Sequence, residues 1–424
     1  MGNLDYTQVL NKIENTRRFG NEPGVVVTAQ VIKVLREKGK QKRIIPYIHV
    51  AGTNGKGSVC AFFSSILKKE HMRVGTFVSP HLVDFEERIT VDGRMIPKED
   101  VTRLGNYLLD IDFGIGLTMF DYCLAMALLY FEEQQCDYMV IETGLGGRLD
   151  STNAIGTPQC AVITKIGYDH MAILGSDIAD IAAEKAGIIK ENGTVVVEQQ
   201  DKRAMQVIEQ EAQKKHARII TVEQSDIERC SGYALRLCGT FQWENAAAAE
   251  LAARYVLGKR YGGPEYEMQY DKTGPKSEKT DLNKRIKSAL EEALWPGRME
   301  IVSKELFLLV DGAHNSNGVD ALKESLMQMY PGEKFCFFMG VMADKDYDVM
   351  IREILPLAEE FYTVTPDSDR ALQASHLADF IRKEGVEATE LSGVDEIRKH
   401  LKRDTKNVAF GSLYFIGELK QHRI

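Results

Sequence analysis

The sequence lacks several features that mark whole classes of protein. Its seven cysteines include no Cys-x-x-Cys pair, so we expect reduced, buried thiols rather than a disulfide framework or a zinc site. Its apolar runs are too short to cross a bilayer; the longest, residues 120–131, contains Asp121. Residues 1–6 form neither a basic nor an apolar signal region. We therefore expect a cytoplasmic protein with no membrane partner.

The sequence also lacks an excess of positive charge. Its formal net charge is −9, so no global positive field attracts nucleic acid, and we expect no nucleic-acid partner. Anionic small substrates remain compatible with this charge, provided that local basic groups and magnesium neutralise them. A length of 424 residues with 44% hydrophobic content predicts two or three globular domains.

One glycine-rich stretch organises the rest of the chain. Residues 44–50 predict a buried strand, a helix is expected from residue 59 to 70, and a glycine-rich loop joins them. Such a loop brings backbone N–H groups to a phosphate at a helix N-terminus, with Lys56 as the cation and Ser58 as a magnesium ligand. Only two residues separate Gly52 from the Gly55-Lys56 pair, where the general P-loop has four. A plain glycine-rich turn is the alternative interpretation.

Strands and helices alternate along both halves of the chain. Strands are predicted at 74–79, 138–142, 160–166, 194–198, 218–222, 306–310, 335–340, 360–365 and 408–410, and helices at 3–18, 25–37, 117–133, 178–186 and 241–257. This alternation predicts two α/β domains with mainly parallel sheets. Residues 262–287 are polar and rich in Gly, Pro and charge, so we expect an exposed insertion or linker. We place the domains at 1–295 and 296–424.

Chemically useful side chains follow several of the predicted strands. Ser58, Ser79, Glu142 and His170 each lie just beyond a strand, and ligands of parallel sheets bind at the carboxyl ends of the strands. This convergence predicts a single active site. The Gly-rich run after Glu142 has leucine at position 149, where a dinucleotide fingerprint needs its third glycine, which argues against NAD.

Eight motifs together resemble one family. They are HVAGTNGKGS at 49–58, SPHL at 79–82, ETGLGGRLD at 142–150, DH at 169–170, EKAGIIK at 184–190, WPGR at 295–298, DGAHN at 311–315 and GSLY at 411–414. The chain is similar to the folylpolyglutamate synthase / dihydrofolate synthase family of the Mur ligase superfamily. The resemblance implies a P-loop central domain of the Mur ligase type plus a smaller Rossmann-like C-terminal α/β domain. It also implies ATP-dependent addition of L-glutamate to a folate or dihydropteroate carboxylate through an acyl phosphate.

The resemblance also implies roles for individual residues. Lys56, His170 and Lys185 are the implied catalytic residues, Ser79, Glu142 and His170 ligate two magnesium ions, and Lys185 is carbamylated (N6-carboxylysine). The implied ATP contacts are Gly52, Thr53, Asn54, Gly55, Lys56, Gly57 and Ser58 in the loop, Asn245 on adenine, Arg298 on phosphate and Asp311 on ribose. The implied substrate contacts are Phe120, Asp121, Tyr122, Cys123, Leu149, Asp150 and Ser151 for the pterin compound, with His314 and Ser412 for glutamate.

Each of these residues also has a structural interpretation. Ser79 could be a turn residue, Glu142 a surface charge and His170 a hydrogen-bonded loop histidine. Lys185 could offset the helix dipole before Gly187. Arg298 could belong to a structural ion pair, Asp311 to a turn and Asn245 to an exposed helix turn. Residues 120–123 could be helix core.

Two departures from the family pattern leave the acceptor open. Residues 21–27 read NEPGVVV where the family carries a leucine- and arginine-containing run, and Cys123 stands where bifunctional members carry an acidic residue. The alternatives are a Mur-type ligase for another carboxylate, a P-loop ATPase or kinase, and a nucleotide-binding regulator without turnover. The family implies a monomer.

Overall fold

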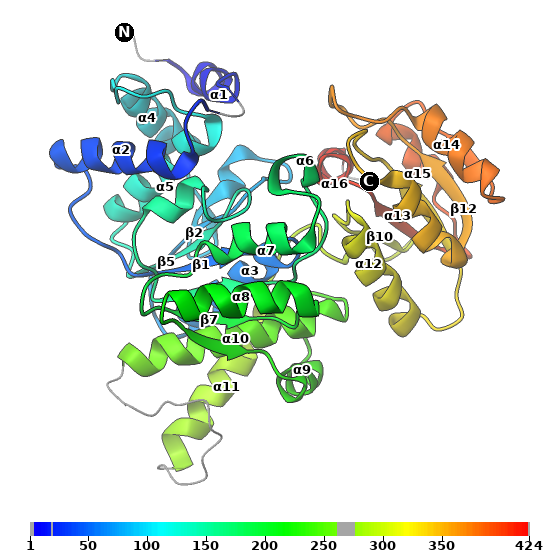
Figure 1. Ribbon diagram of the computed structural model, residues 1–424. Helices are drawn as coiled ribbons and strands as arrows, with labels where there is room; N and C mark the ends of the chain where they lie inside the picture. Colours follow the sequence, from blue (N-terminus) through cyan, green and yellow to red (C-terminus); the bar gives the residue numbers. More distant parts are fainter. Residues whose placement is uncertain (1–3, 18–19, 261–275, 423–424) are drawn as a thin grey trace. The chain divides into compact units, whose positions relative to one another are not determined.

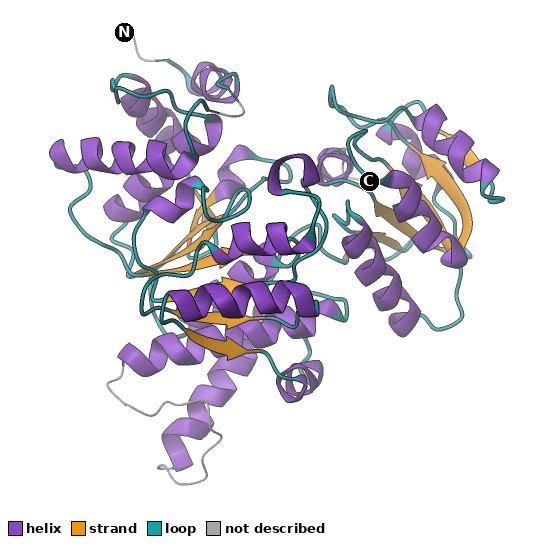
Figure 2. Cartoon of the chain, viewed as in Figure 1, coloured by secondary structure: helices purple, strands orange, loops and turns teal. Residues whose placement is uncertain are grey.

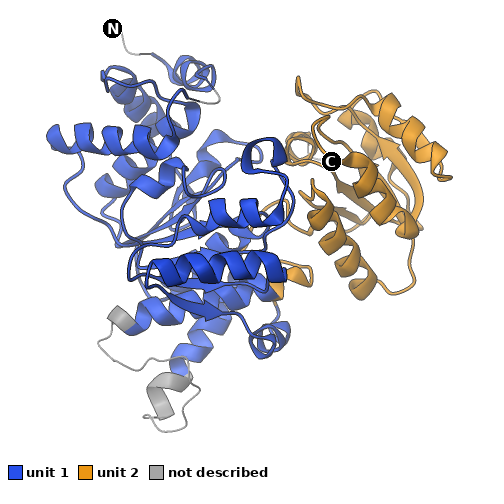
Figure 3. Cartoon of the chain, in the orientation of Figure 1, with its two compact units in different colours: residues 1–234, 244–293 blue, residues 235–243, 294–424 orange. Residues whose placement is uncertain are grey.

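The computed structural model describes residues 4–17, 20–260 and 276–422, and these form two compact units. The first unit comprises Met1–Ala234 and Glu244–Ala293, and the second comprises Leu235–Trp243 and Leu294–Ile424 (Figure 3). Each unit contains one β-sheet with helices around it (Figure 2). The predicted α/β class with mainly parallel sheets is confirmed.

The first unit is built on a sheet whose strands run in the order β4-β3-β2-β5-β1-β6-β7-β8. The strands are β1 (Tyr47–Ala51), β2 (Val74–Phe77), β3 (Ile89–Val91), β4 (Arg94–Met95), β5 (Tyr138–Glu142), β6 (Cys160–Ile163), β7 (Thr194–Val197) and β8 (Arg218–Thr221). All neighbours pair in parallel except at the β2–β3–β4 edge. The carboxyl ends of β1, β5 and β6 therefore lie side by side, which is what the predicted site needs.

Helices cover this sheet (Figure 1). They are α1 (Tyr6–Glu14), α2 (Gly24–Glu37), α3 (Lys56–Lys69), η1 (Phe85–Arg88), α4 (Lys98–Leu109), α5 (Met119–Glu133), η2 (Ser151–Ala154), α6 (Met171–Leu174), α7 (Ile178–Ala186), α8 (Lys202–Lys214), α9 (Gln224–Ser231), α10 (Phe241–Arg260) and α11 (Lys276–Glu292). One core gathers apolar side chains of α1, α2, α4 and α5 with β2 and β5, and a second gathers those of α7 and α8 with β6 and β7. None of the helices in the described ranges is long and apolar enough to span a bilayer.

Helix α11 corrects one expectation. Of the segment 262–287, residues 262–275 lie outside the described residues, and the expectation of an exposed linker is wrong for the remainder, which is helical. Leu282 and Ile286 are buried because they lie one helical turn apart on the face that packs against α3. The Ser65 hydroxyl donates to the Ala289 carbonyl over 2.7 Å. The second half of this segment therefore supports the helix that begins at the glycine-rich loop.

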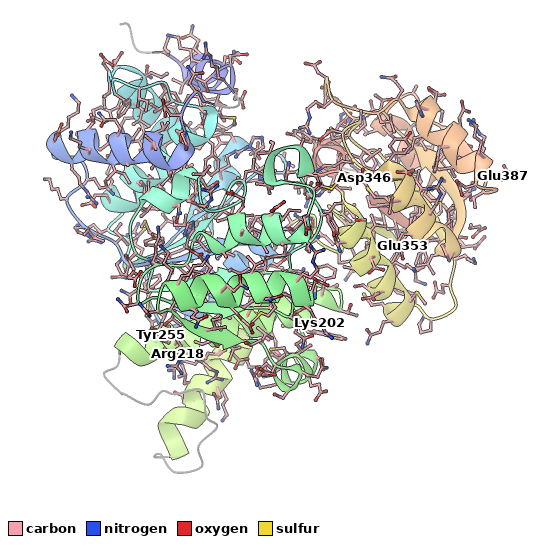
Figure 4. All side chains as sticks on the ribbon, viewed as in Figure 1. Lys202, Arg218, Tyr255, Asp346, Glu353 and Glu387 are labelled. Atoms are coloured by element: carbon pink, nitrogen blue, oxygen red, sulfur yellow. The ribbon has the colours of Figure 1, made fainter. Side chains whose placement is uncertain are left out.

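Helix α10 runs along β7 and is anchored at both ends. Near its start the Glu244 carboxylate accepts the N–H of Gln199, which follows β7, over 2.6 Å. Further along, the Tyr255 hydroxyl accepts from Thr194 at the start of β7 over 2.7 Å. Figure 4 labels Tyr255 close to Arg218, the first residue of β8. These anchors place the first turn of α10 at the carboxyl ends of the strands.

The second unit is a smaller sheet with the order β13-β12-β11-β14-β10-β9, parallel except for β9. Its strands are β9 (Glu300–Ser303), β10 (Leu308–Val310), β11 (Phe335–Met339), β12 (Ala358–Thr363), β13 (Ala388–Glu390) and β14 (Lys406–Phe410). Its helices are α12 (Ser316–Met329), α13 (Tyr347–Ile354), η3 (Leu355–Leu357), α14 (Ala374–Lys383), η4 (Val394–Glu396), α15 (Ile397–His400) and α16 (Leu413–Gln421). Phenylalanines of β11, β12 and β14 form the centre of its core.

The cysteines agree with the expectation of reduced thiols. Among the described residues none of the seven forms a disulfide, and all but the half-buried Cys238 are buried. Burial raises the pKa of Cys123 to about 11. The six buried thiols are therefore core residues.

Candidate functional site

The glycine-rich loop joins the carboxyl end of β1 to α3, as the sequence predicts, and two of its glycines are required by the space around them. A Cβ at Gly52 would lie 1.7 Å from Thr164 Oγ1, and a Cβ at Gly55 would lie 2.2 Å from Asn245 Oδ1. Gly55 also has a φ of 90°, in the left-handed region. The structure thereby places Asn245, from the first turn of α10, directly against the loop.

A segment that sequence reasoning missed holds the loop from behind. The carbonyl of Lys165 accepts the N–H groups of Thr53 (2.9 Å) and Asn54 (3.2 Å), and the Thr164 hydroxyl donates to the Asn54 carbonyl (2.6 Å). Thr53 also exchanges hydrogen bonds of 3.0 Å between its hydroxyl and the backbone of Gly167. We call residues 164–167, which follow β6, the supporting segment. The shape of the glycine-rich loop is therefore set by the segment that follows the neighbouring strand, β6.

Lys56 is the first residue of α3, so its side chain folds back over the loop. Its Nζ donates to the carbonyls of Gly52 and Thr53, both over 3.2 Å, and lies 3.9 Å from Glu142 Oε1. Ser58 is buried in the first turn of α3. A cation, a buried hydroxyl and a helix N-terminus thus share one edge of the sheet, an arrangement suited to a polyphosphate.

Glu142 ends β5, the strand beside β1, and is buried. Its Oε2 accepts the backbone N–H of Ser79 over 3.2 Å, which brings the end of β2 to the same place. Among the described residues, no three His, Cys, Asp or Glu side chains gather as a metal site. A carboxylate beside a serine fits magnesium, because this hard ion takes one or two protein oxygens and completes its shell with phosphate and water.

Lys185 lies in the last turn of α7, but it is not a surface residue that offsets the helix dipole. It is only 4% exposed, and its Nζ donates to the carbonyl of Gly52 over 2.8 Å. Burial and the nearby charge of Lys56 lower its pKa to about 7, against the opposing charges of Asp169 and Asp150. A large share of this amine is therefore neutral near pH 7, as carbamylation requires.

His170 is less enclosed than the other predicted catalytic and metal-binding residues. It is the N-cap residue of α6 and has a φ of 51°. Its side chain is 38% exposed, and its backbone N–H donates to Asp169 Oδ1 over 2.8 Å. Its Nε2 lies 4.0 Å from the same carboxylate oxygen. Its described link to the site runs through Asp169, whose charge acts on Lys185. Asp169 is thus a further residue of this site.

The loop after β5 is held by a buried polar network. Asp150 accepts the N–H groups of Gly144 (3.0 Å) and Leu145 (2.9 Å) with one carboxylate oxygen, and the N–H (3.0 Å) and hydroxyl of Thr152 with the other. Burial raises the pKa of Asp150. The Thr152 oxygen lies 2.7 Å from Nε2 of His49, which is inside β1 and whose pKa burial lowers to about 3. His49 is therefore neutral. Because the Thr152 hydroxyl already donates to Asp150, His49 donates from Nε2.

Of the remaining predicted substrate residues, some present apolar surface and others are buried. Leu149 is 42% exposed, and Phe120 packs over Gly144, where a Cβ would lie 2.7 Å from the ring. Asp121 is buried and accepts from Ser151 over 2.6 Å, while its other oxygen accepts the N–H and hydroxyl of Thr118. The helix-core interpretation holds for Cys123, which is 0% exposed and belongs to the core around α5, so we remove it from the substrate site. Tyr122 is half-buried and packs against that core.

Four predicted residues lie in the second unit: Arg298 just before β9, Asp311 and His314 after β10, and Ser412 after β14. Asp311 is buried and accepts the N–H groups of Met299 and Ala313, both over 2.8 Å. Burial raises its pKa, and the positive charge of Arg298 opposes the shift. His314 Nδ1 lies 2.8 Å from the carbonyl of Gly312. Ser412 caps α16 by accepting the N–H of Phe415 over 3.1 Å.

Sequence reasoning overlooked the residues that hold this site in place, chiefly His49, Thr152, Thr164 and Lys165. One signal was available for His49: a histidine in the middle of an apolar, β-branched strand must be buried and needs a partner. The other three residues are ordinary loop residue types, and their partners in β1 and the glycine-rich loop lie far away in the sequence.

Two family models match the chain. The Mur ligase middle domain matches residues 50–230, and the Mur ligase, glutamate ligase domain matches residues 297–410. The chain is 33% identical to the dihydrofolate synthase/folylpolyglutamate synthase of Bacillus subtilis, over 98% of both chains. It is 29% identical to the folylpolyglutamate synthase of Lacticaseibacillus casei, over 87% of each. Its structure is similar to that of Escherichia coli FolC in complex with DHPP and ADP, with a TM-score of 0.80 and 26% identity over 99% of this chain and 97% of that chain.

Proposed function

The chain belongs to the folylpolyglutamate synthase / dihydrofolate synthase family of the Mur ligase superfamily, and from this premise we propose that it joins L-glutamate to the carboxylate of a folate at the expense of ATP. Dihydropteroate is the proposed second acceptor, since the Bacillus subtilis relative is named for both activities. The observation that carries the proposal is the meeting of the P-loop with Glu142, whose Oε1 lies 3.9 Å from Lys56 Nζ.

The reaction needs positioning and neutralisation of charge more than covalent help from the protein. The acceptor carboxylate attacks the γ-phosphorus of ATP, giving an acyl phosphate and ADP. The neutral amine of glutamate then attacks the acyl carbon, forming the amide and releasing phosphate and a proton. The backbone N–H groups of residues 55–58 and the Lys56 ammonium stabilise the transferring phosphoryl group. Asn245 contacts adenine, and Arg298 and Asp311 contact phosphate and ribose.

Magnesium would bind at two places. Glu142 and Ser79 would hold one ion, and His170 and a carbamylated Lys185 would hold the other. Magnesium supplies charge neutralisation on the phosphate oxygens when bound. The buried Glu142 carboxylate, held by the Ser79 N–H, is oriented before any ion arrives.

The environment of Lys185 supports the proposed carbamylation. The neutral amine adds to carbon dioxide, forming a carbamate and releasing a proton, and a pKa of about 7 makes this amine available near neutral pH. The change Lys185→Ala should abolish ligation, and millimolar formate or acetate should restore part of it by replacing the carbamate oxygens. Lys190→Ala is the control, because Lys190 donates to the Asn153 carbonyl and has no carbamate role. Absence of rescue at every carboxylate concentration would remove the carbamate from the proposal.

The acceptor would lie against the loop after β5. Leu149 and Phe120 offer apolar surface for the pterin ring, with Tyr122 beside them. Asp150, Ser151 and Asp121 keep this loop in place. His314 and Ser412 would contact the incoming glutamate.

The decisive experiment measures phosphate release with ATP, magnesium and L-glutamate, offering dihydropteroate and tetrahydrofolate in separate reactions. Glutamate-dependent release with both acceptors would establish a bifunctional enzyme, and release with one would identify its acceptor. Lys56→Ala should abolish release, while Lys68→Ala, at the far end of the same helix, should not. Release that ignores glutamate would instead identify an ATPase and overturn the proposal.

We also propose that the protein acts as a cytoplasmic monomer. Light scattering on the purified chain tests the oligomeric state, and a mass of two chains would contradict it.

A further inference from the structure

Three polar residues that no catalytic role accounts for follow β7: Glu198, Gln199 and Gln200. Strand β7 pairs with β6, so its carboxyl end lies beside the supporting segment. The N–H of Glu198 still donates to the Ile163 carbonyl over 3.0 Å, which extends the pairing by one residue. Beyond this bond, hydrogen bonds from the side chains of Glu198 and Gln200 replace the backbone pairing between β6 and β7.

The side chains of Glu198 and Gln200 hold the backbone of the supporting segment. Glu198 Oε2 accepts the N–H of Lys165 over 2.7 Å. Gln200 Oε1 accepts the N–H of Ile166 over 2.9 Å, and its Nε2 donates to the Thr164 carbonyl over 3.0 Å. Thr164, Lys165 and Ile166 are thereby each held by a hydrogen bond to one of these two side chains.

The held segment in turn holds the P-loop. The Lys165 peptide accepts two P-loop N–H groups at its carbonyl, and its own N–H donates to Glu198. The Thr164 hydroxyl donates to the Asn54 carbonyl over 2.6 Å. Glu198 and Gln200 are therefore two hydrogen bonds away from the phosphate-binding loop.

The burial of Glu198 shows that its carboxyl group does not act as a surface charge. The residue is 1% exposed, and among the described residues its Oε1 has no hydrogen-bond partner. Two charged groups act on it, Glu244 from α10 and Lys165 from the supporting segment, and burial with the Glu244 charge raises its pKa well above the usual value. The Oε2 atom of this buried side chain is the acceptor that the N–H of Lys165 needs.

Gln199, the residue between Glu198 and Gln200, contacts the helix that carries Asn245, the residue proposed to contact adenine. The Gln199 N–H donates to Glu244 Oε1 over 2.6 Å, and the next residue of α10, Asn245, lies against Gly55. One short segment thus fixes both the P-loop and the start of α10.

We infer that Glu198 and Gln200 are positioning residues of the nucleotide site, holding the supporting segment so that the P-loop keeps the shape that binds phosphate. The inference rests on the proposed ATP-dependent function, and it adds two residues that do not touch the nucleotide. Removing either side chain leaves backbone donors or acceptors of the supporting segment without partners, so the segment and the loop in front of it should relax.

The test measures the affinity of the full chain for magnesium-ADP by calorimetry, with Glu198→Ala, Gln200→Ala, Glu198→Gln and the control Gln199→Ala. The two alanine variants should bind ADP about tenfold more weakly, the value expected for a lost buried hydrogen bond. Glu198→Gln keeps an oxygen that can accept the Lys165 N–H and should bind within about twofold of the parent. Gln199→Ala should bind as the parent does, because Gln199 makes its described contacts through the backbone.

A purely structural role would give a different pattern. The alanine variants would then lower the unfolding temperature while leaving ADP affinity and the KM for ATP at the Gln199→Ala values, and this result would overturn the inference. The same holds if Glu198→Gln binds as weakly as Glu198→Ala. Gln200→Ala keeps the test decisive if Glu198→Ala does not fold. Failure of the proposed function is separate: it would appear as phosphate release that ignores glutamate, with ADP affinities still ordered as above.

Discussion

Lys185, at the end of α7, donates from Nζ to the carbonyl oxygen of Gly52, the residue that opens the P-loop, over 2.8 Å. Lys56 donates to the same oxygen from within the loop over 3.2 Å. Burial, together with repulsion between the two ammonium groups at this carbonyl, lowers the pKa of Lys185. This shared acceptor connects Lys56, which is proposed to bind phosphate, to the lysine proposed to be carbamylated.

Replacing Lys185 with methionine should stabilise the fold at neutral pH. The folded pKa of about 7 lies below the ordinary value of 10.5, so between these values the unfolded state binds more protons. The wild type therefore gains stability relative to Lys185→Met as the pH rises from about 7 to 10.5. Below about pH 7 the buried ammonium group destabilises the folded wild type by its full amount. We expect the variant to be more stable by about 3 kcal/mol at pH 6.5, after allowing for the lost hydrogen bond, and by much less at pH 9.5.

Urea unfolding in buffer free of carbon dioxide measures this difference. An equal stability gap between variant and wild type at both pH values would contradict the shifted pKa.

Gly55→Ala should strongly weaken nucleotide binding without unfolding the protein. The new Cβ would lie 2.2 Å from Asn245 Oδ1 at a φ of 90°, so the loop or Asn245 has to move. We expect ADP affinity to fall by about a hundredfold or more. Gly39→Ala is the matched control, because Gly39 also has a left-handed φ, of 66°, but a Cβ there meets nothing within 4 Å. The control should lose about 1 kcal/mol of stability and no affinity.

Glu142→Gln should raise the magnesium concentration that ligation requires. The amide keeps an oxygen to accept the Ser79 N–H but loses the charge that attracts the ion. Initial rates measured against magnesium at fixed ATP should show a half-maximal concentration about ten- to a hundredfold higher. Glu133→Gln, on the surface end of α5 where Glu133 pairs with Arg103, serves as the control. Identical magnesium curves for all three proteins would exclude Glu142 as a ligand.

Thr152→Val should destabilise the first unit much more than Thr152→Ser. Valine removes the hydroxyl that accepts from His49 and donates to Asp150, so two buried groups lose a partner. The expected loss is about 2–4 kcal/mol, against about 1 kcal/mol for serine, which keeps the hydroxyl. Denaturant titration compares them. If serine proved as harmful as valine, the methyl group and not the hydrogen bonds would be what matters.

Much of the fold follows from local patterns. The bounds of β5 and α7 are those predicted. An apolar run marks β5, and a short amphipathic run between Asp177 and Gly187 marks α7, so neighbouring residues alone define both elements. Strand β1 starts at Tyr47, three residues later than predicted, since Pro46 has no N–H to donate to the sheet. The polar sequence of α11 concealed its buried face, which exists only because α3 packs against it.

The sequence by itself determined where the site had to be. A glycine-rich turn after one parallel strand and a glutamate at the end of another must meet at the same sheet edge, and Lys56 and Glu142 do meet there. What the tertiary structure decided is how these groups are held and in which charge state. Glu198 with Lys165, and His49 with Thr152, are 33 and 103 residues apart. A polar residue type does not specify its distant partner, and burial, which exists only in the folded chain, sets the pKa of Lys185.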